Sequence, residues 1–451
     1  MIQRIKKYIN KSEFVSNSLT LFTGTTIAQI IPLLVSPFLS RIYTPENFGL
    51  LALYMSIVSI LAVFSTGRYE LAIMLPKKNS DAINIFALSV MVAFVVSIII
   101  LIVILFFNNQ ISSFIGNREI SFFLYFIPIS VFSLGLYKSL NYWFNRNNKF
   151  KSIAKSKVIA GSTNSGLALG TGLIKKGSYG LIFAWIIGQL ASSVFLLYKL
   201  IIHEKEYFKK IKRVKIIAVS RRYKKFPIFD TWSELLNVLS VQLPIIILTY
   251  FYGETITGHY SFAYKILLLP FSLLAFSMGQ AFFKNANELK SSGKEISTFT
   301  FGVLKKLILI SFIPLAVFGF FGDFIFPFIF GKEWLIAGNY SRIFSLWIFI
   351  IFISSPLTNL FAIYEKQRTN LIFNLVMILS RIGLLIYMSK RGYDDYSSVF
   401  VYVVSGFVFR FLYLLLIIRI AKIKILKVIF EIVKVVIPSI LILYILRVLI
   451  I

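Results

Sequence analysis

Long apolar segments recur along the whole chain, and short stretches between them carry most of the charged residues. Each segment has about 20 residues or more, the length of an α-helix that crosses a hydrocarbon core about 30 Å thick. The pattern predicts spans at 18–40, 48–75, 83–107, 120–143, 153–174, 179–202, 227–251, 257–283, 300–329, 337–363, 369–388, 396–418 and 428–450. The sequence therefore predicts an all-α polytopic membrane protein with no sizeable soluble domain.

Composition supports this prediction and narrows the chemistry. Hydrophobic residues make up 58% of the 451 residues, whereas soluble chains contain about half. The formal net charge is +30, but the basic residues cluster between apolar segments, so we expect no nucleic-acid partner. The chain has no Cys and only two His, His203 and His259. Disulfides, thiolate nucleophiles and Cys/His metal centres are therefore excluded, and no cofactor is expected.

Lys and Arg fall mainly in alternate loops, which predicts the orientation of the chain. The N-terminal residues 1–12 and the stretch 199–225 are strongly basic. The opposite loops carry few basic residues, namely Arg41, Arg118, Lys175, Lys176, Lys332, Lys390 and Arg391. The positive-inside rule then predicts a cytoplasmic N-terminus. No short apolar segment with a cleavage site follows the basic start, so we expect no removable signal peptide.

One long polar connection divides the predicted spans into two groups. We expect an N-terminal lobe at 1–202, a basic cytoplasmic linker at 203–226, a C-terminal lobe at 227–420 and an extra helix at 421–451. The linker is interpreted as an orientation-setting loop that rests on anionic headgroups, and a regulatory or partner-binding role is the alternative. Glu431 and Lys434 interrupt the last apolar segment, which is either a further span, as we favour, or a helix lying against the bundle.

Several segments resemble a known family. The stretch 20–51, TLFTGTTIAQIIPLLVSPFLSRIYTPENFGLL, resembles the first helix and outer turn of polysaccharide flippases of the multidrug/oligosaccharidyl-lipid/polysaccharide (MOP) exporter superfamily. Residues 67–76 are similar to the end of their second helix, and residues 226–270 to their seventh and eighth helices. The order and spacing of these segments carry the resemblance over about 18–420, and the extra C-terminal segment departs from it.

The resemblance implies a fold and a function. It implies about twelve core helices in two six-helix lobes around a central cavity. It also implies flipping of undecaprenyl-pyrophosphate-linked oligosaccharide repeat units from the inner to the outer leaflet, for O-antigen and other lipopolysaccharide, capsule or exopolysaccharide synthesis. The expected partners are this lipid-linked oligosaccharide, membrane lipids, a polysaccharide polymerase and a chain-length regulator, and the chain is expected to be a monomer.

Two arginines lie deepest in the predicted spans and give the strongest indication of a site. Arg381 and Arg410 lie well inside 369–388 and 396–418. A charge at mid-bilayer costs about 2.5–3.5 kcal/mol on insertion scales, so each needs a polar cavity or a partner acid. We favour a cationic cavity, because guanidinium groups suit phosphate oxygens. The alternative is an interhelical ion pair.

Further charged residues complete the predicted site. Arg68, Lys138 and Lys265 are candidates for additional substrate contacts, with snorkelling or ion pairing as the alternative. Because Arg68 and Glu70 are two residues apart, they would point in different directions on a continuous helix and could not pair.

Carboxylates near the cytoplasmic side are candidates for coupling a proton or a cation. Asp230 and Glu234 are four residues apart and share one helix face, and Glu70 is the third candidate. The alternative for the first pair is structural, because Thr231 and Glu234 have the spacing of a capping box at a helix N-terminus.

Two other functions remain open at this point. A drug or cation antiporter of the same superfamily is expected to hold more intramembrane acids than bases, and the chain shows the reverse. A membrane glycan polymerase or ligase needs a large outer loop or an acidic cluster, and the outer turns offer no acid pair other than Asp394 and Asp395. A transporter is therefore favoured over an enzyme.

Overall fold

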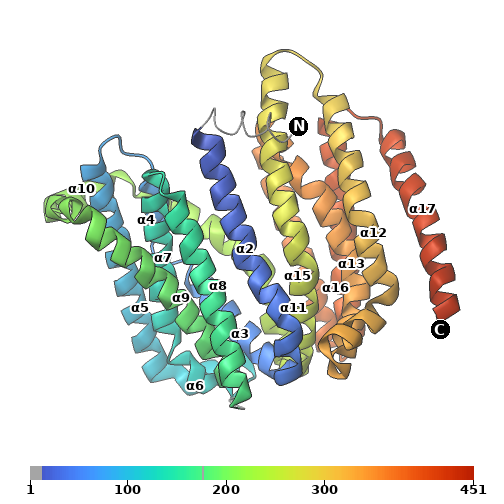
Figure 1. The fold of residues 1–451 in the computed structure, drawn as a ribbon, viewed down its shortest axis with the longest axis horizontal. Helices are drawn as coiled ribbons and strands as arrows, with labels where there is room; N and C mark the ends of the chain where they lie inside the picture. Colours follow the sequence, from blue (N-terminus) through green and yellow to red (C-terminus); the bar gives the residue numbers. More distant parts are fainter. Residues whose placement is uncertain (1–12, 175–176, 451) are drawn as a thin grey trace. The chain divides into compact units, whose positions relative to one another are not determined.

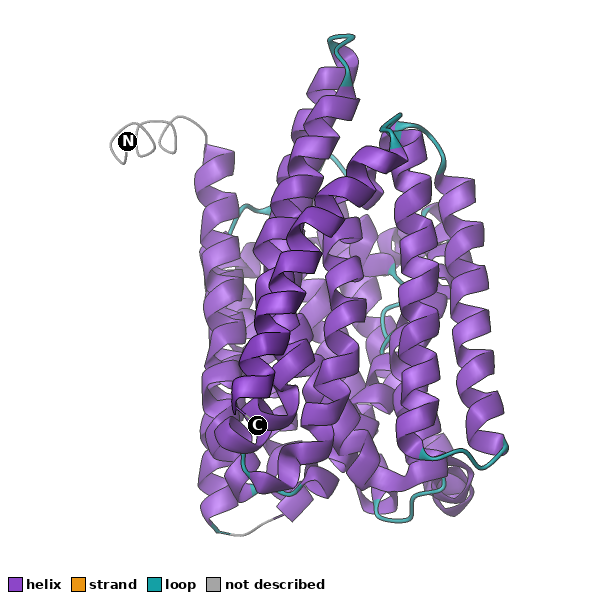
Figure 2. Cartoon of the chain, turned by 90° about the vertical axis from the view of Figure 1, so that its right-hand side faces the viewer, coloured by secondary structure: helices purple, strands orange, loops and turns teal. Residues whose placement is uncertain are grey.

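A computed structural model describes residues 13–174 and 177–450, and these residues fold into helices joined by short loops (Figure 2). No strand occurs in these two ranges. Nine helical segments among them are long and apolar enough to cross a membrane. The basic residues 1–12 and Lys175 and Lys176, which contribute to the predicted orientation, lie outside the described residues. The all-α polytopic prediction is confirmed.

The chain divides into two compact units, Met1–Thr257 and Gly258–Ile451. Helix α11 (Thr231–Ser291) belongs to both, and Gly253 interrupts it with φ 82° and ψ 176°. The positive φ suits glycine, which has no Cβ to clash in this region. The predicted boundary lay earlier, at 203–226, so the assignment of residues 227–257 to a C-terminal lobe stays a prediction.

The first unit contains helices that follow most predicted spans. They are α2 (Glu13–Ile42), α3 (Pro45–Leu61), α4 (Tyr69–Ala72), α5 (Asn79–Ile115), α6 (Ile120–Leu124), α7 (Ile127–Arg146), α8 (Phe150–Leu173), α9 (Gly177–Glu204), η1 (Lys205–Lys210), α10 (Arg213–Arg222), η2 (Phe226–Asp230) and the first part of α11.

Small residues let the helices of the first unit pack closely. Helix α8 lies beside α2 and α9 (Figure 1). A Cβ on Gly161 of α8 would lie 2.7 Å from the carbonyl oxygen of Ala28 on α2, and a Cβ on Gly188 of α9 would lie 2.8 Å from that of Ala160. Such close backbone approach provides van der Waals contact between membrane helices, where lipid removes the hydrophobic driving force.

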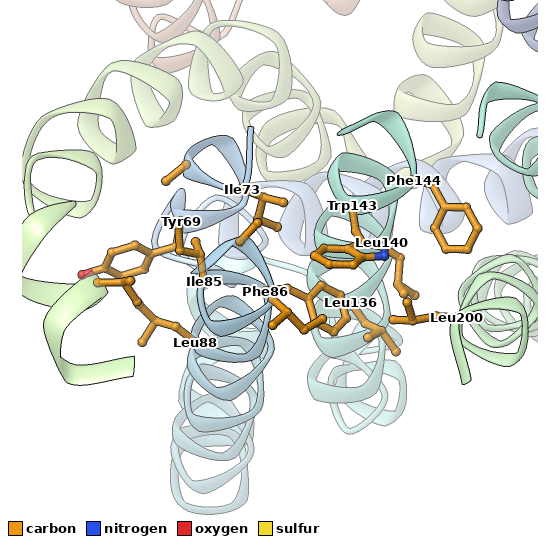
Figure 3. Packing of buried hydrophobic residues seen from close by; sticks show 14 of the residues in the cluster. Tyr69, Ile73, Ile85, Phe86, Leu88, Leu136, Leu140, Trp143, Phe144 and Leu200 are labelled. Carbon is orange, nitrogen blue, oxygen red and sulfur yellow. The ribbon is translucent and has the colours of Figure 1, made fainter. Parts of the chain in front are cut away.

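The predicted linker is folded rather than an open loop. It contains η1 and α10, which pack against α5. Val219 and Tyr223 are buried in the cluster drawn in Figure 3, where the Trp143 ring lies 6.1 Å from Phe86 and 5.4 Å from Tyr207. These apolar residues sit among the lysines and arginines of the linker, so one face of the segment is buried while the charges stay exposed.

The second predicted span is wrong in one respect, because it is not one continuous helix. Helix α3 ends at Leu61 and α4 begins at Tyr69, with turns between them. Gly67 and Arg68 have φ values of 55° and 59°. Irregular backbone at membrane depth is tolerated where protein or a polar cavity satisfies its polar groups.

The second unit holds the rest of the chain. Its elements are the second part of α11, α12 (Ile296–Phe330), η3 (Lys332–Trp334), α13 (Leu335–Ser354), η4 (Ser355–Thr358), α14 (Asn359–Ile363), α15 (Gln367–Lys390), α16 (Asp395–Ile420) and α17 (Ile425–Ile450).

Helix α12 is the common neighbour of α13 and α17. A Cβ on Gly338 of α13 would lie 2.5 Å from the carbonyl oxygen of Gly322 on α12, so the two backbones touch. Helix α17 is long and apolar enough to cross a membrane. Its Glu431 pairs with Lys305 of α12 at 3.1 Å, rather than with Lys434 as its sequence spacing allowed.

Candidate functional site

Arg381 lies in an aromatic cage formed by three helices of the second unit. It projects from α15, and its guanidinium carbon lies 4.2 Å from the ring centre of Trp347 on α13 and 4.0 Å from that of Tyr402 on α16. The side chain is only 7% exposed. A cation over an aromatic face is attracted to the ring, by about 2 kcal/mol when the pair is desolvated. The cage therefore holds the charge in place without a carboxylate.

Gly406 makes room for this cage. A Cβ at this position of α16 would lie 2.8 Å from Nε1 of Trp347 and 2.9 Å from both Nε and the guanidinium carbon of Arg381. Any larger residue would push both side chains away. Glycine here is a packing requirement of the cage, because the backbone itself is ordinary helix.

The polar atoms of the cage are not satisfied by the protein. Nε and Nη2 of Arg381 and Nε1 of Trp347 are buried and have no hydrogen-bond partner among the described residues. Arg381 also makes no salt bridge within the described part of the chain. The predicted alternative of an interhelical ion pair for Arg381 is therefore not what the structure contains.

Arg410 lies one turn along α16 from Gly406 and is half-buried. Its guanidinium carbon lies 5.2 Å from the ring centre of Tyr413, whose hydroxyl donates to Oδ1 of Asn370 at 2.5 Å. No carboxylate pairs with Arg410 in the described ranges.

Aromatic side chains extend from the cage toward the second part of α11. The rings of Tyr264 and Trp347 stack with centres 5.6 Å apart, and Tyr264 packs edge-on against Phe344 at 5.7 Å. Tyr260 stacks on Tyr264 at 6.3 Å. Helices α11, α13, α15 and α16 thus share one layer of aromatic rings that contains two cations and no acid among the described residues.

A second charged cluster lies in the first unit, and its members are paired. Nη1 of Arg68 lies 3.6 Å from Oε1 of Glu70, and Nη2 lies 3.8 Å from Oε2 of Glu234. Glu70 is 1% exposed and also accepts a hydrogen bond from the Thr66 hydroxyl. The prediction that Arg68 and Glu70 cannot pair is wrong, because the helix is interrupted at Arg68 and the 100° step per residue no longer applies.

Lys138 hydrogen-bonds to the interrupted segment between α3 and α4. Its Nζ donates to the carbonyl oxygen of Ala62 at 2.9 Å, just after α3 ends. A carbonyl at the end of a helix has no intrahelical donor, so the lysine satisfies it. This arrangement accounts for Lys138 without a substrate.

Two further predicted residues make no salt bridge within the described part of the chain. Asp230 and Lys265 are exposed. The predicted capping box is wrong: Thr231 lies in helical conformation between η2 and α11, and its buried hydroxyl has no partner among the described groups. Glu234 therefore faces Arg68 instead of capping a helix, because the helical chain begins before Thr231.

Comparison with known proteins identifies the family to which the chain belongs. The sequence profile of the family described as Polysaccharide biosynthesis protein matches residues 38–339. The chain belongs to this family. No curated protein matches the chain.

Solved structures show that this family member shares the MOP fold. The lipid II flippase MurJ in an inward closed conformation superposes with a TM-score of 0.71 at 17% identity, over 96% of this chain and 92% of MurJ. An inward-facing multidrug resistance MATE family transporter of the MOP superfamily gives 0.68 at 16% identity, over 89% of this chain and 95% of that one. A MOP superfamily transporter from Pyrococcus furiosus, described by a reverse polarity of its binding pocket, gives 0.61 at 14% identity, over 91% and 96%.

The chain is thus a multi-pass membrane protein of the polysaccharide biosynthesis family, with the fold of MOP superfamily transporters. The resemblance stated from the sequence is confirmed at this level. No group of three or more His, Cys, Asp or Glu side chains that could hold a metal ion occurs in the described ranges.

Sequence reasoning missed several residues that shape the charged regions of this transporter. Asp323 of α12 accepts from Arg447 of α17 at 2.7 Å and lies 3.4 Å from Arg342 of α13. Trp347 and Gly406 were also missed, because nothing in the sequence distinguishes them from other residues of apolar spans. Only the depth of Arg381 and Arg410 marked the region in advance.

Proposed function

We propose that this transporter flips undecaprenyl-pyrophosphate-linked oligosaccharide repeat units from the inner to the outer leaflet. Membership of the polysaccharide biosynthesis family supports a glycan substrate. The observation that carries the proposal is the pair of arginines, Arg381 and Arg410, without a carboxylate partner in the described spans. Uncompensated cations within a membrane are costly, and a pyrophosphate would neutralise them.

Alternating access is the proposed mechanism. The pyrophosphate contacts the two guanidinium groups, with Lys265 as an additional contact, while the polyprenyl tail stays in the lipid. Guanidinium groups bind phosphate oxygens through paired N–H donors. A membrane potential that is negative inside assists the outward movement of the anion by about 2.3 kcal/mol per charge per 100 mV.

A cation antiporter is less well supported by the same geometry. Three acids near or within the spans have basic partners: Glu70 and Glu234 pair with Arg68, and Asp323 pairs with Arg342 and Arg447. A cationic drug would have to displace these partners. We therefore propose that Glu70 and Glu234 hold the structure of the first unit and have no role in coupling.

A flipping assay in liposomes tests the function. Purified protein is reconstituted with a fluorescent undecaprenyl-pyrophosphate-linked oligosaccharide, and transfer between leaflets is followed by quenching from one side. The variants Arg381→Met and Arg410→Met are expected to transport far less than the wild type. Arg342→Met is the matched control, because Arg342 has an acidic partner. Full transport by both test variants would overturn the assignment of the two arginines.

The membrane that holds the protein and the orientation of its N-terminus are also part of the proposal. We infer a bacterial inner-membrane protein with its N-terminus in the cytoplasm, which hands its product to a polymerase and chain-length regulator for O-antigen, capsule or exopolysaccharide synthesis. Because the chain has no Cys, single cysteines report sidedness cleanly. Arg118→Cys should react with an impermeant thiol reagent from outside intact cells, and Lys209→Cys only after permeabilisation. The reverse result would invert the orientation.

A further inference from the structure

Three buried N–H donors meet at Gly406 without an acceptor. They are Nε1 of Trp347 and Nε and Nη2 of Arg381. The position of a Cβ on Gly406 is 2.8 Å from Nε1 of Trp347 and 2.9 Å from Nε of Arg381. Nε1 of Trp347 and Nε of Arg381 therefore lie close to one point on α16, although they come from α13 and α15, and Nη2 belongs to the same guanidinium group.

The same types of side chain are satisfied elsewhere in the chain. Buried Trp143 donates through Nε1 to Oε2 of Glu204 at 2.7 Å. Arg146 donates to Asn79 and to the carbonyl oxygens of Ile73 and Pro76. Nε of Arg68 is also buried without a partner, but that guanidinium group faces two carboxylates, whereas the donors around Gly406 face none.

Leaving such donors unpaired has a cost that another interaction must offset. Each buried donor without an acceptor has lost the hydrogen bond that it would make with water. Stacking of the guanidinium on Trp347 and Tyr402 compensates the charge but provides no acceptor for the N–H groups. An incoming oxyanion would provide both the negative charge and the acceptor oxygens.

We propose that Trp347, Arg381 and Gly406 form a subsite for a phosphate group of the substrate, in which the indole N–H of Trp347 is a direct ligand. This inference rests on the proposed function, because the anion is taken to be the pyrophosphate of the lipid carrier. In this structure the side chains of Trp347 and Arg381 close the subsite. When the anion enters, they move apart above Gly406, which has no Cβ. Arg410, one turn away on α16, faces the remaining charge.

The indole N–H itself provides the most direct test. Protein labelled with ¹⁵N-tryptophan in lipid nanodiscs has five indole N–H groups, from Trp143, Trp185, Trp232, Trp334 and Trp347. The Trp347 resonance is assigned as the one that Trp347→Phe removes. Adding inorganic pyrophosphate should move this resonance downfield and leave that of Trp334 unchanged. A Trp347 resonance that does not respond in the wild type, or that responds equally in Arg381→Met, would overturn the subsite.

Affinity gives a second readout with a matched pair of variants. Gly406→Ala places a methyl group against both donors and should weaken pyrophosphate binding at least tenfold, about the effect of losing one hydrogen bond to a charged group. Trp347→Phe keeps a ring under Arg381 and should weaken binding by about the same factor. Gly383→Ala is the control, because a Cβ there has nothing within 4 Å and lies on α15 near Arg381. Equal affinities in all three variants would exclude the subsite.

Two further comparisons identify the source of the phosphate and distinguish failure of the subsite from failure of the proposed function. Inorganic pyrophosphate and undecaprenyl pyrophosphate are compared as ligands, and a free-anion site would respond only to the first. If Trp347→Phe weakens binding but the wild type flips no lipid-linked sugar, the subsite stands and the function fails. If the wild type flips and Trp347→Phe binds normally, the function stands and the subsite fails.

Discussion

The arginines of the first unit and those of α15 and α16 differ in their surroundings. Arg68 lies between two carboxylates, of Glu70 and Glu234. Arg381 lies between two aromatic rings and has no acid partner among the described residues. Both are arginines in predicted spans of a basic chain, and they differ in depth as well as in their partners. The difference indicates that a paired arginine stabilises the fold, whereas an unpaired one is available for an anion.

The largest expected effect comes from the unpaired arginines. The double variant Arg381→Met/Arg410→Met should lower the flipping rate about 1,000-fold, because each charge-assisted contact contributes about 2 kcal/mol. Its thermal unfolding midpoint should be unchanged or higher, since methionine keeps most of the volume and removes charges that have no acidic partner among the described residues. Flipping in liposomes and unfolding in detergent measure the two quantities. Normal flipping with a lower midpoint would contradict the comparison.

The paired arginine should show the opposite pattern. Arg68→Met leaves Glu70, which is 1% exposed, without its cation, and should destabilise the protein by about 3 kcal/mol. Adding Glu70→Gln removes the remaining charge and should restore most of the loss, because glutamine still accepts from Thr66. Thermal unfolding of the two single variants and the double variant measures this coupling. Additive losses would mean that the pair does not interact.

A paired site in the second unit tests whether pairing, rather than location, determines the role. Asp323→Asn weakens the contacts of Arg447 and Arg342 with α12 and should cost about 1.5 kcal/mol, the contribution of one charge-assisted hydrogen bond. Hydrogen exchange should increase mainly in α17, while flipping per folded molecule stays normal. Glu431→Gln is the smaller control, because its partner Lys305 is 45% exposed. Loss of flipping in Asp323→Asn would show that paired arginines also serve transport.

Hydropathy predicted the helical spans apart from the break within 48–75, and the cost of a charge in lipid singled out Arg381 and Arg410, because both signals act locally. It did not predict the partners. Arg68 meets Glu70 only because the helix breaks before Tyr69, and the sequence pattern of 48–75 is continuously apolar enough to hide the break. Asp323 of α12 pairs with Arg342 of α13 and with Arg447 of α17, and α17 is distant from α12 in the sequence.

The packing role of Gly406 could not be predicted from the sequence for a similar reason. Its role depends on which side chains from α13 and α15 reach it, and that is decided by tertiary contacts. Glycine is common in membrane helices and by itself indicates only close approach. The cage around Arg381 could therefore not be predicted, although the presence of a deep cation could.

The smallest expected effect comes from Glu234, and it tests the boundary between the two classes of arginine. Its Oε2 lies 3.8 Å from Arg68, and its side chain is 31% exposed. A partly solvated pair at this distance contributes about 0.5 kcal/mol, and salt screens it. Glu234→Gln should therefore lower the unfolding midpoint slightly at low salt and not at high salt, with Asp230→Asn as the unchanged control. If Glu234→Gln instead abolished flipping with normal stability, the carboxylates of the first unit would be coupling groups. Pairing would then no longer separate structural from functional charges in this transporter.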